Sequence, residues 1–261
     1  MSELQNIPPM YSAALPAGAG AKADNFAEGW AVRGAADNNE ITTTETDIGD
    51  WRGTYSYPSG DVGASIASDD ANDAGAGTGA RVVQIRYLDS SYARQTTTVT
   101  LTGTTEVEFA TDYFRTERVT VLTVGSGGSN AGALWVGASS DTWTAGVPAS
   151  PYFNVGVGHS VSNTAIRTVP AGFKFEPAQW FFNGENSKIA FVYIEVRSPL
   201  GGGAYTPWYR TGPLTVESGG VYVPAIAAQA LAAGTDLRLR GAMSSGTEKL
   251  FASLAGFLTR V

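Results

Sequence analysis

The chain has 261 residues, a formal net charge of −7 and a sequence pI of about 4.8. This length can bury a full hydrophobic core, as one large β domain or as two smaller ones. The absence of cysteine excludes disulfides and thiolate metal sites, and without a basic cluster we expect no nucleic-acid binding. No segment approaches 18 consecutive apolar residues, so we expect no membrane-spanning helix.

Residues 1–25 are rich in Ala, Pro and Gly and lack a sustained hydrophobic period. We expect an extended arm that is ordered where it docks on a neighbouring chain, with Pro8, Pro9 and Tyr11 in the contact. Plain terminal disorder is the alternative interpretation.

Residues 26–150 are predicted to form an N-terminal β domain. Its clearest signal is a hairpin, in which Val83, Ile85 and Tyr87 alternate with polar residues and a threonine-rich strand returns over residues 96–102. Period-two alternation bounded by turn residues is typical of a half-buried antiparallel pair of strands.

Residues 151–261 are predicted to form a C-terminal β-sandwich domain, with the boundary near Pro148–Pro151. The alanine-rich segment 224–234 favours either a helix of one or two turns or an extended approach to the next strand. The strands that we expect in this half cover residues 164–169, 173–182, 188–197, 213–216, 236–240 and 249–259.

Short strands separated by glycine- and proline-rich turns predict an all-β fold. We expect an antiparallel β-sandwich, resembling a jelly roll, built as two β modules with the extended N-terminal arm.

Residues that could carry chemistry are sparse. His159 is the only histidine and stands in a glycine-rich segment, so a loop histidine is favoured over a catalytic or metal-binding one. The acidic segment Asp69–Asp73 departs from the EF-hand template at its fifth and twelfth positions. A solvated turn is favoured there, and a looser calcium site is the alternative.

Two further motifs do not favour a catalytic function. Gly75, Gly77 and Gly79 precede a strand and not a helix, so a phosphate-binding loop is not expected. A glycosidase needs two carboxylates at a defined separation. The sequence gives no such separation for the candidates in the second half of the chain, which are Glu176, Glu185, Glu195 and Glu217. We therefore expect no catalytic residue, no cofactor and no metal.

The aromatic segment around Tyr205, Trp208 and Tyr209 follows the glycine run 201–203. Such a tip offers a large contact area with few rotatable bonds, as interface anchors do. We predict contact between subunits or packing in the core, with stacking on a sugar as the alternative.

Three stretches resemble recurring segments of virion structural proteins of tailed bacteriophages, particularly phages of marine and aquatic bacteria. They are residues 77–103 around GTGAR, LD and TVTLTG, residues 164–172 (TAIRTVPAG), and residues 233–240 (AGTDLRLR) with the closing strand 255–258. Together they span most of the chain after residue 75.

The resemblance implies a non-enzymatic virion protein, made in the host cytoplasm and acting through contacts with the major capsid protein or other virion proteins. A capsid decoration or cement protein, or a head-fibre subunit, is the leading hypothesis, and we expect a homo-oligomer, with a trimer favoured. An acidic chain would be repelled by packaged DNA, which favours a place on the outside of the particle. The alternative is a receptor- or glycan-binding module of a tail or attachment fibre.

Overall fold

The computed structural model describes residues 28–35, 41–49, 55, 57–58, 62–162, 165–184, 190–201, 204–216, 221–224, 230–247 and 249–261. Pro8, Pro9 and Tyr11 lie outside these residues, as does the whole predicted arm. The protein is all-β, with antiparallel pairing throughout the named strands and no helix among the described residues. The predicted antiparallel sandwich is confirmed, whereas jelly-roll connectivity stays a prediction.

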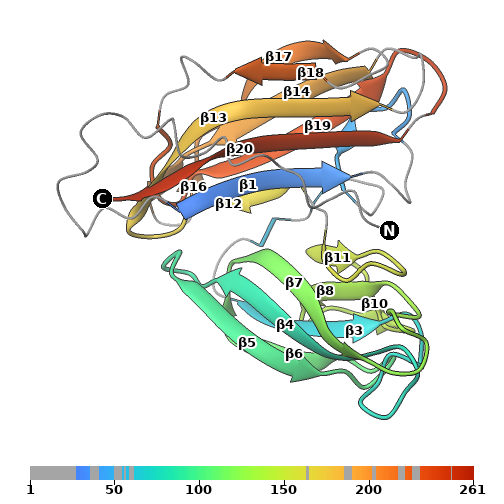
Figure 1. The fold of residues 1–261 in the computed structure, drawn as a ribbon. Helices are drawn as coiled ribbons and strands as arrows, with labels where there is room; N and C mark the ends of the chain where they lie inside the picture. The colour runs from blue at the N-terminus through green and yellow to red at the C-terminus, as the bar shows by residue number, and fades with distance from the viewer. Residues whose placement is uncertain are drawn as a thin grey trace.

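Two β modules lie one above the other (Figure 1). The lower module, as drawn there, pairs its strands in one sheet of order β11-β8-β3-β6 and another of order β5-β4-β7. Its strands are β3 (Val62–Ser68), β4 (Ala80–Leu88), β5 (Arg94–Thr100), β6 (Val107–Tyr113), β7 (Arg115–Val124), β8 (Leu134–Ala138), β9 (Trp143–Thr144), β10 (Val147–Pro148) and β11 (Phe153–Val155).

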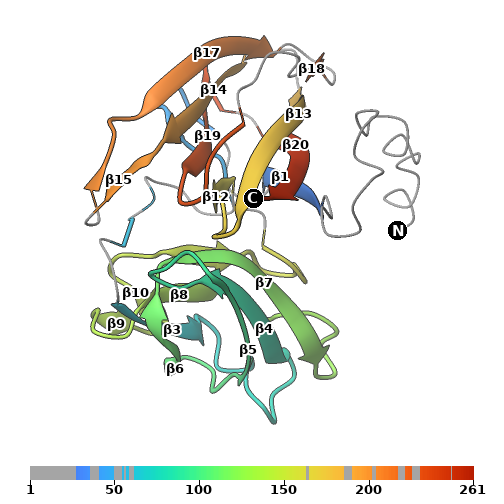
Figure 2. The ribbon, with the colours of Figure 1, turned by 90° about the vertical axis from the view of Figure 1, so that its left-hand side faces the viewer.

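The upper module is a second sandwich, whose two sheets are seen as separate layers in Figure 2. One sheet has the order β1-β20-β13-β18, and the other has the order β12-β19-β14-β17 with β2 beside β19. Its strands are β1 (Glu28–Ala35), β2 (Thr46–Asp47), β12 (Ile166–Thr168), β13 (Phe173–Gly184), β14 (Ala190–Arg197), β15 (Pro199–Gly201), β16 (Ala204–Tyr205), β17 (Tyr209–Val216), β18 (Val221–Pro224), β19 (Asp236–Met243) and β20 (Leu250–Arg260).

Sheet membership does not follow the predicted division into the domains 26–150 and 151–261. Strand β1 pairs along its whole length with β20, from Glu28 opposite Leu258 to Ala35 opposite Phe251. Strand β11, which follows residue 150, pairs with β8 of the lower module. The lower module is therefore inserted between an early segment and the later strands that together form the upper sandwich.

Each module has its own hydrophobic core. Phe175, Phe182 and Leu254 are completely buried between the upper sheets, and Ile66, Ile85 and Leu134 are completely buried between the lower ones. Burying one such side chain contributes about 1.5–3 kcal/mol, so each sandwich can be held by its own packing.

The threonine-rich hairpin is confirmed as β4 paired with β5, from Val82 opposite Thr100 to Leu88 opposite Arg94. Val99 is buried, while Thr96, Thr98 and Thr100 are exposed. In the segment 224–234, Leu231 exchanges backbone hydrogen bonds with Phe175. The chain is thus extended at Leu231 and turns at residues 233–234, and residues 225–229 lie outside the described residues.

Candidate functional site

The two modules are joined by a buried ion pair. Arg115 is the first residue of β7 in the lower module, and its Nη2 lies 3.1 Å from Oδ2 of Asp236, the first residue of β19 in the upper module. The two side chains are 2% and 0% exposed. Nη1 of Arg115 also donates to the carbonyl oxygens of Phe114 and Pro58, at 2.7 and 3.3 Å. This desolvated pair therefore fixes the junction at a defined place.

Asp236 also accepts bonds from a second guanidinium group. Nε and Nη2 of Arg197, at the end of β14, lie 2.9 and 2.7 Å from its Oδ2, and the Thr168 hydroxyl donates to Oδ1. Burial works against the charge on Arg115, but the charge and hydrogen bond of Asp236, together with the nearby tyrosine side chains, outweigh burial and raise the pKa of Arg115. The group of Arg115, Arg197 and Asp236 is called the Asp236 cluster below.

A second set of charges closes into a ring beside this cluster. Arg238 bonds Glu195 at 2.5 Å, Arg240 bonds Glu45 at 2.5 Å, and Arg210 bonds both of these glutamates. Asp47 lies 3.8 Å from Arg238 and 3.5 Å from Arg240, which completes the ring. The members of this ionic ring are Glu45, Asp47, Glu195, Arg210, Arg238 and Arg240. Three guanidinium groups thus face three carboxylates.

The ionic ring predicts a pH-dependent stability. Burial alone would raise the pKa of Glu195, but the hydrogen bonds and charges of Arg210 and Arg238 hold it below its ordinary value of 4.5. The stabilisation is then complete above that ordinary value and is lost as the pH falls through the lower value of the folded protein. We expect Glu195→Gln to reduce the free energy of unfolding by about 2–3 kcal/mol near neutral pH, and by much less near pH 3.

Urea unfolding of the wild type and of Glu195→Gln across this pH range measures the effect. Asp47, whose pKa is raised by burial, is present in both proteins, so the difference between them at each pH reports on Glu195. Glu176→Gln is the matched control, since Glu176 is 43% exposed and paired with Lys174 at the surface. It should change stability by less than about 1 kcal/mol at any pH. A Glu195→Gln effect that does not shrink on acidification would contradict the prediction.

Aromatic rings surround these guanidinium groups. The central carbon of Arg197 lies 4.1 Å from the ring centre of Tyr57, 4.4 Å from that of Tyr205 and 4.6 Å from that of Trp208. Arg238 lies 4.1 Å from Trp208 on the side of the ionic ring. Cation–π contacts of this kind gain strength when the groups are withdrawn from water, so the rings hold the arginine side chains in place.

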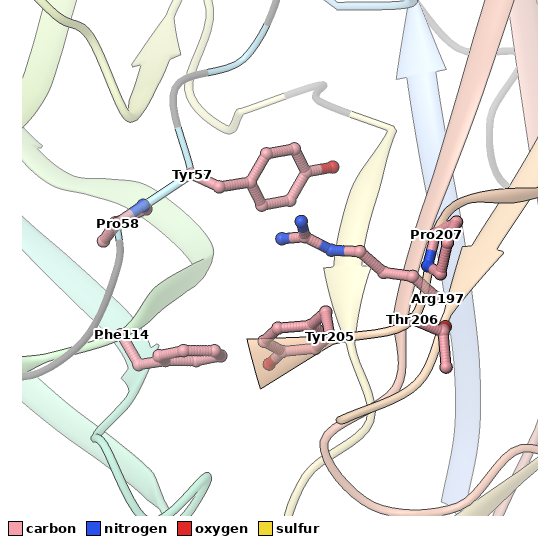
Figure 3. Close-up of a pocket in the computed structure, with 7 residues that line it drawn as sticks. All are labelled: Tyr57, Pro58, Phe114, Arg197, Tyr205, Thr206 and Pro207. Atoms are coloured by element: carbon pink, nitrogen blue, oxygen red, sulfur yellow. The ribbon is translucent and has the colours of Figure 1, made fainter. Parts of the chain in front are cut away.

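A pocket of about 450 Å³ opens beside the Asp236 cluster, at the junction of the modules. Figure 3 shows the Arg197 guanidinium group in its centre, between the rings of Tyr57 and Tyr205, with Phe114 alongside Tyr205. The rings of Phe114 and Tyr205 are nearly parallel, at 15°, with centres 6.5 Å apart. The residues that line the pocket are Tyr57, Pro58, Phe114, Arg197, Tyr205, Thr206 and Pro207.

The predicted aromatic tip is divided between the inside and the outside of the molecule. Tyr205 stacks with Phe114 of the lower module, and Trp208 packs on Tyr57 at 5.4 Å between ring centres. These two residues thus make contacts within the chain, as the core-packing interpretation expects. Tyr209 is 71% exposed and is available to another molecule. A role in contacts between subunits stays a prediction for all three.

The acidic segment 69–73 is the turn that the sequence favours, and most of its residues are exposed, but its last carboxylate is not solvated. Asp73 is completely buried. One of its carboxylate oxygens accepts the amides of Ala80 and Ala131 at 2.5 and 2.8 Å, and the other accepts the amide of Gly132 at 2.8 Å and the Ser68 hydroxyl at 2.6 Å. The carboxylate joins two loops of the lower module and acts as a structural acceptor.

Two glycines of the predicted motif, Gly77 and Gly79, allow the chain to pack closely against the turn 69–73. A Cβ atom on Gly77 would lie 2.0 Å from the carbonyl oxygen of Asn72, and one on Gly79 would lie 2.1 Å from the Asp73 carboxylate. These close approaches require glycine, and β4 follows the loop as predicted.

The other candidates for chemistry are dispersed. His159 lies half-buried in the turn after β11, Glu176 pairs with Lys174, and Glu195 belongs to the ionic ring. Glu185 and Glu217 lie outside the described residues. Across the described part of the chain no group of three or more His, Asp or Glu residues is arranged to hold a metal ion. The same residues include no helix long and apolar enough to span a membrane.

Sequence reasoning missed Arg115, Arg197 and Asp236 as the residues that join the modules. One signal was present, because Glu195 and Arg197 alternate with valine and isoleucine on one strand, and Arg238 and Arg240 alternate with leucine on another. Charged residues at every second position of two strands indicate a shared ionic face when the strands pair, as β14 and β19 do.

Comparison with known proteins adds no relative: no protein-family model matches the chain, and no curated protein matches its sequence. The resemblance to phage virion proteins stays a prediction.

Proposed function

We propose that this chain is a non-enzymatic structural protein of a tailed-bacteriophage particle, acting as a capsid decoration or cement protein or as a head-fibre subunit. The observation that carries this proposal is the use of the buried charges. Asp73, Asp236 and Glu195 are each engaged by several donors within the chain, and Arg115 ties one module to the other. Charges committed in this way stabilise a rigid body, which is what a structural subunit of a particle requires.

The partners that we propose are the major capsid protein or other virion proteins, together with further copies of the chain in a homo-oligomer, with a trimer favoured. Tyr209 and Leu200 support such contacts, since they are 71% and 66% exposed on the upper module. Tyrosine is enriched among the residues that anchor protein interfaces. The virion would be the site of action, after synthesis in the host cytoplasm.

Immunolabelling tests the proposal. Antibodies against the purified chain should label intact virions of the phage that encodes it, seen by electron microscopy, with label on the head for a decoration or head-fibre protein. Light scattering of the purified chain should give a mass near three times that of one chain. Virions without label, checked by mass spectrometry of purified particles, would reject the virion role.

A second candidate function is a receptor- or glycan-binding module of a tail or attachment fibre. One observation favours it, namely the aromatic pocket with an arginine at its centre. Label confined to the tail would support this candidate over the first.

A further inference from the structure

The charges beside the pocket are unequal. In the ionic ring, three guanidinium groups face three carboxylates. In the Asp236 cluster, Arg115 and Arg197 share one carboxylate, and no further carboxylate of the described residues pairs with either arginine. Withdrawing an unbalanced charge from water is costly. The Asp236 cluster therefore favours a bound anion more than the ionic ring does, in which the charges balance.

Arg197 is placed to receive that anion. Its Nε and Nη2 both bond Asp236, while Nη1 has no hydrogen-bond partner among the described residues. The side chain is 16% exposed, so it can be reached from the pocket. A guanidinium group with one free nitrogen is suited to a carboxylate, because its donors are fixed in one plane and the bond is charge-assisted.

The remaining walls are suited to a ring-shaped ligand. Tyr205 gives a flat aromatic wall next to the arginine (Figure 3), whereas Phe114 is only 6% exposed and has Arg115 lying 4.0 Å over its ring. Thr206 accepts the amide of Ser198 through its hydroxyl oxygen, and this bond leaves the hydroxyl hydrogen for a ligand. A volume of about 450 Å³ is that of a small-ligand site, and such sites are common between domains.

We propose that the pocket between the modules binds one carboxylate-bearing sugar unit, of the kind that ends or branches acidic surface polysaccharides. The sugar carboxylate pairs with Nη1 of Arg197, the apolar face of the sugar ring lies on Tyr205, and Thr206 donates to a sugar oxygen. This inference rests on the second candidate function and names its ligand class. A neutral sugar would leave the charge of the Asp236 cluster unbalanced, and a cation would be repelled by it.

Binding of defined sugars to the purified full chain tests the inference. D-glucuronic acid and N-acetylneuraminic acid are titrated by calorimetry and by saturation-transfer NMR, with methyl glucuronate and glucose as neutral controls. We expect at least one acid to bind at least about tenfold more tightly than both neutral sugars, since only the acid makes the charge-assisted bond. Added salt should weaken the binding of the acid.

Variants locate the site. Tyr205→Leu should weaken binding of the acid about tenfold by removing the flat aromatic wall, whereas Tyr209→Leu, a change at the exposed neighbour, should leave it unchanged. Arg197→Gln should abolish the preference for acid over ester. Near-UV circular dichroism checks folding, and the two tyrosine variants keep the test valid if Arg197→Gln does not fold.

Three results would overturn the inference: no binding of either acid to the folded protein, equal binding of acid and ester, or equal binding by the Tyr205→Leu variant. Binding of benzoate without either sugar acid would also reject the saccharide class. Labelled virions together with no sugar binding would reject this inference alone, and sugar binding together with unlabelled virions would reject the virion role alone.

Discussion

Replacing Asp236 with alanine is expected to lower the free energy of unfolding by about 3–5 kcal/mol, because the change leaves two guanidinium groups without their counter-ion. Arg115 is 2% exposed and has no other carboxylate among the described residues, so water does not replace the lost partner. The loss is large against the 5–15 kcal/mol that holds a typical domain folded.

The change should act on the junction before it acts on either core. Asp236 connects β19 to Arg115 of the lower module, whereas the two hydrophobic clusters are separate. Urea unfolding should therefore show a lower midpoint and a broader or divided transition, since the modules no longer unfold as one unit.

A double-mutant cycle with Arg115→Met isolates the pair. The coupling energy between positions 115 and 236 should fall within the roughly 0.5–3 kcal/mol expected for residues in one network. Glu106→Ala is the control, because Glu106 is an exposed carboxylate of the lower module and should change stability by less than about 0.5 kcal/mol. Additive effects of Asp236→Ala and Arg115→Met would show that the pair does not couple the modules.

Replacing Asp73 with asparagine is expected to destabilise the lower module by about 3–6 kcal/mol. The side-chain NH₂ group of asparagine replaces one carboxylate oxygen and cannot accept a hydrogen bond. It would face the two donors of that oxygen, which are either the amides of Ala80 and Ala131 or the Ser68 hydroxyl and the Gly132 amide. At least two charge-assisted hydrogen bonds are then lost, and buried backbone amides are left unsatisfied.

Hydrogen exchange measured by mass spectrometry locates this effect. Peptides that contain the amides of Ala80, Ala131 and Gly132 should lose protection, while peptides from β13 and β20 in the upper module should exchange as in the wild type. Asp70→Asn is the matched control in the same loop, since among the described residues the Asp70 carboxylate accepts only the exposed amide of Asn72, and the change should cost about 0.5–1.5 kcal/mol at most. Unchanged protection at residues 80 and 131–132 in Asp73→Asn would disprove the structural role of Asp73.

The fold class and most of the strands follow from the local sequence pattern. Alternation of Val83 and Ile85 with polar residues, and of Val192 and Ile194 with Tyr193 and Glu195, is a local property that a strand imposes whatever it pairs with. The predicted strand 173–182 is observed as Phe173–Gly184, and 249–259 as Leu250–Arg260. Glycine and proline turns mark where these strands stop, and they too act locally.

Which strands share a sheet depends on contacts between segments that are distant in the chain. β1 lies beside β20 although more than two hundred residues separate them in the chain. Alternation fixes which face of a strand is buried but does not identify its neighbour, because backbone hydrogen bonds are the same for every residue type. The predicted division at residue 150 followed chain order, and the sheets do not.

The site depends on the same long-range choices. Arg115 and Asp236 are 121 residues apart in the chain, and Arg210 and Glu45 are 165 apart. A charged residue in a strand is equally compatible with a solvated face and with a buried ion pair, and only the position of its partner decides between them. The turn that contains Asp73 was expected to be solvated for the same reason. The amides of Ala131 and Gly132, which donate to its carboxylate, come from a loop that is distant in the chain.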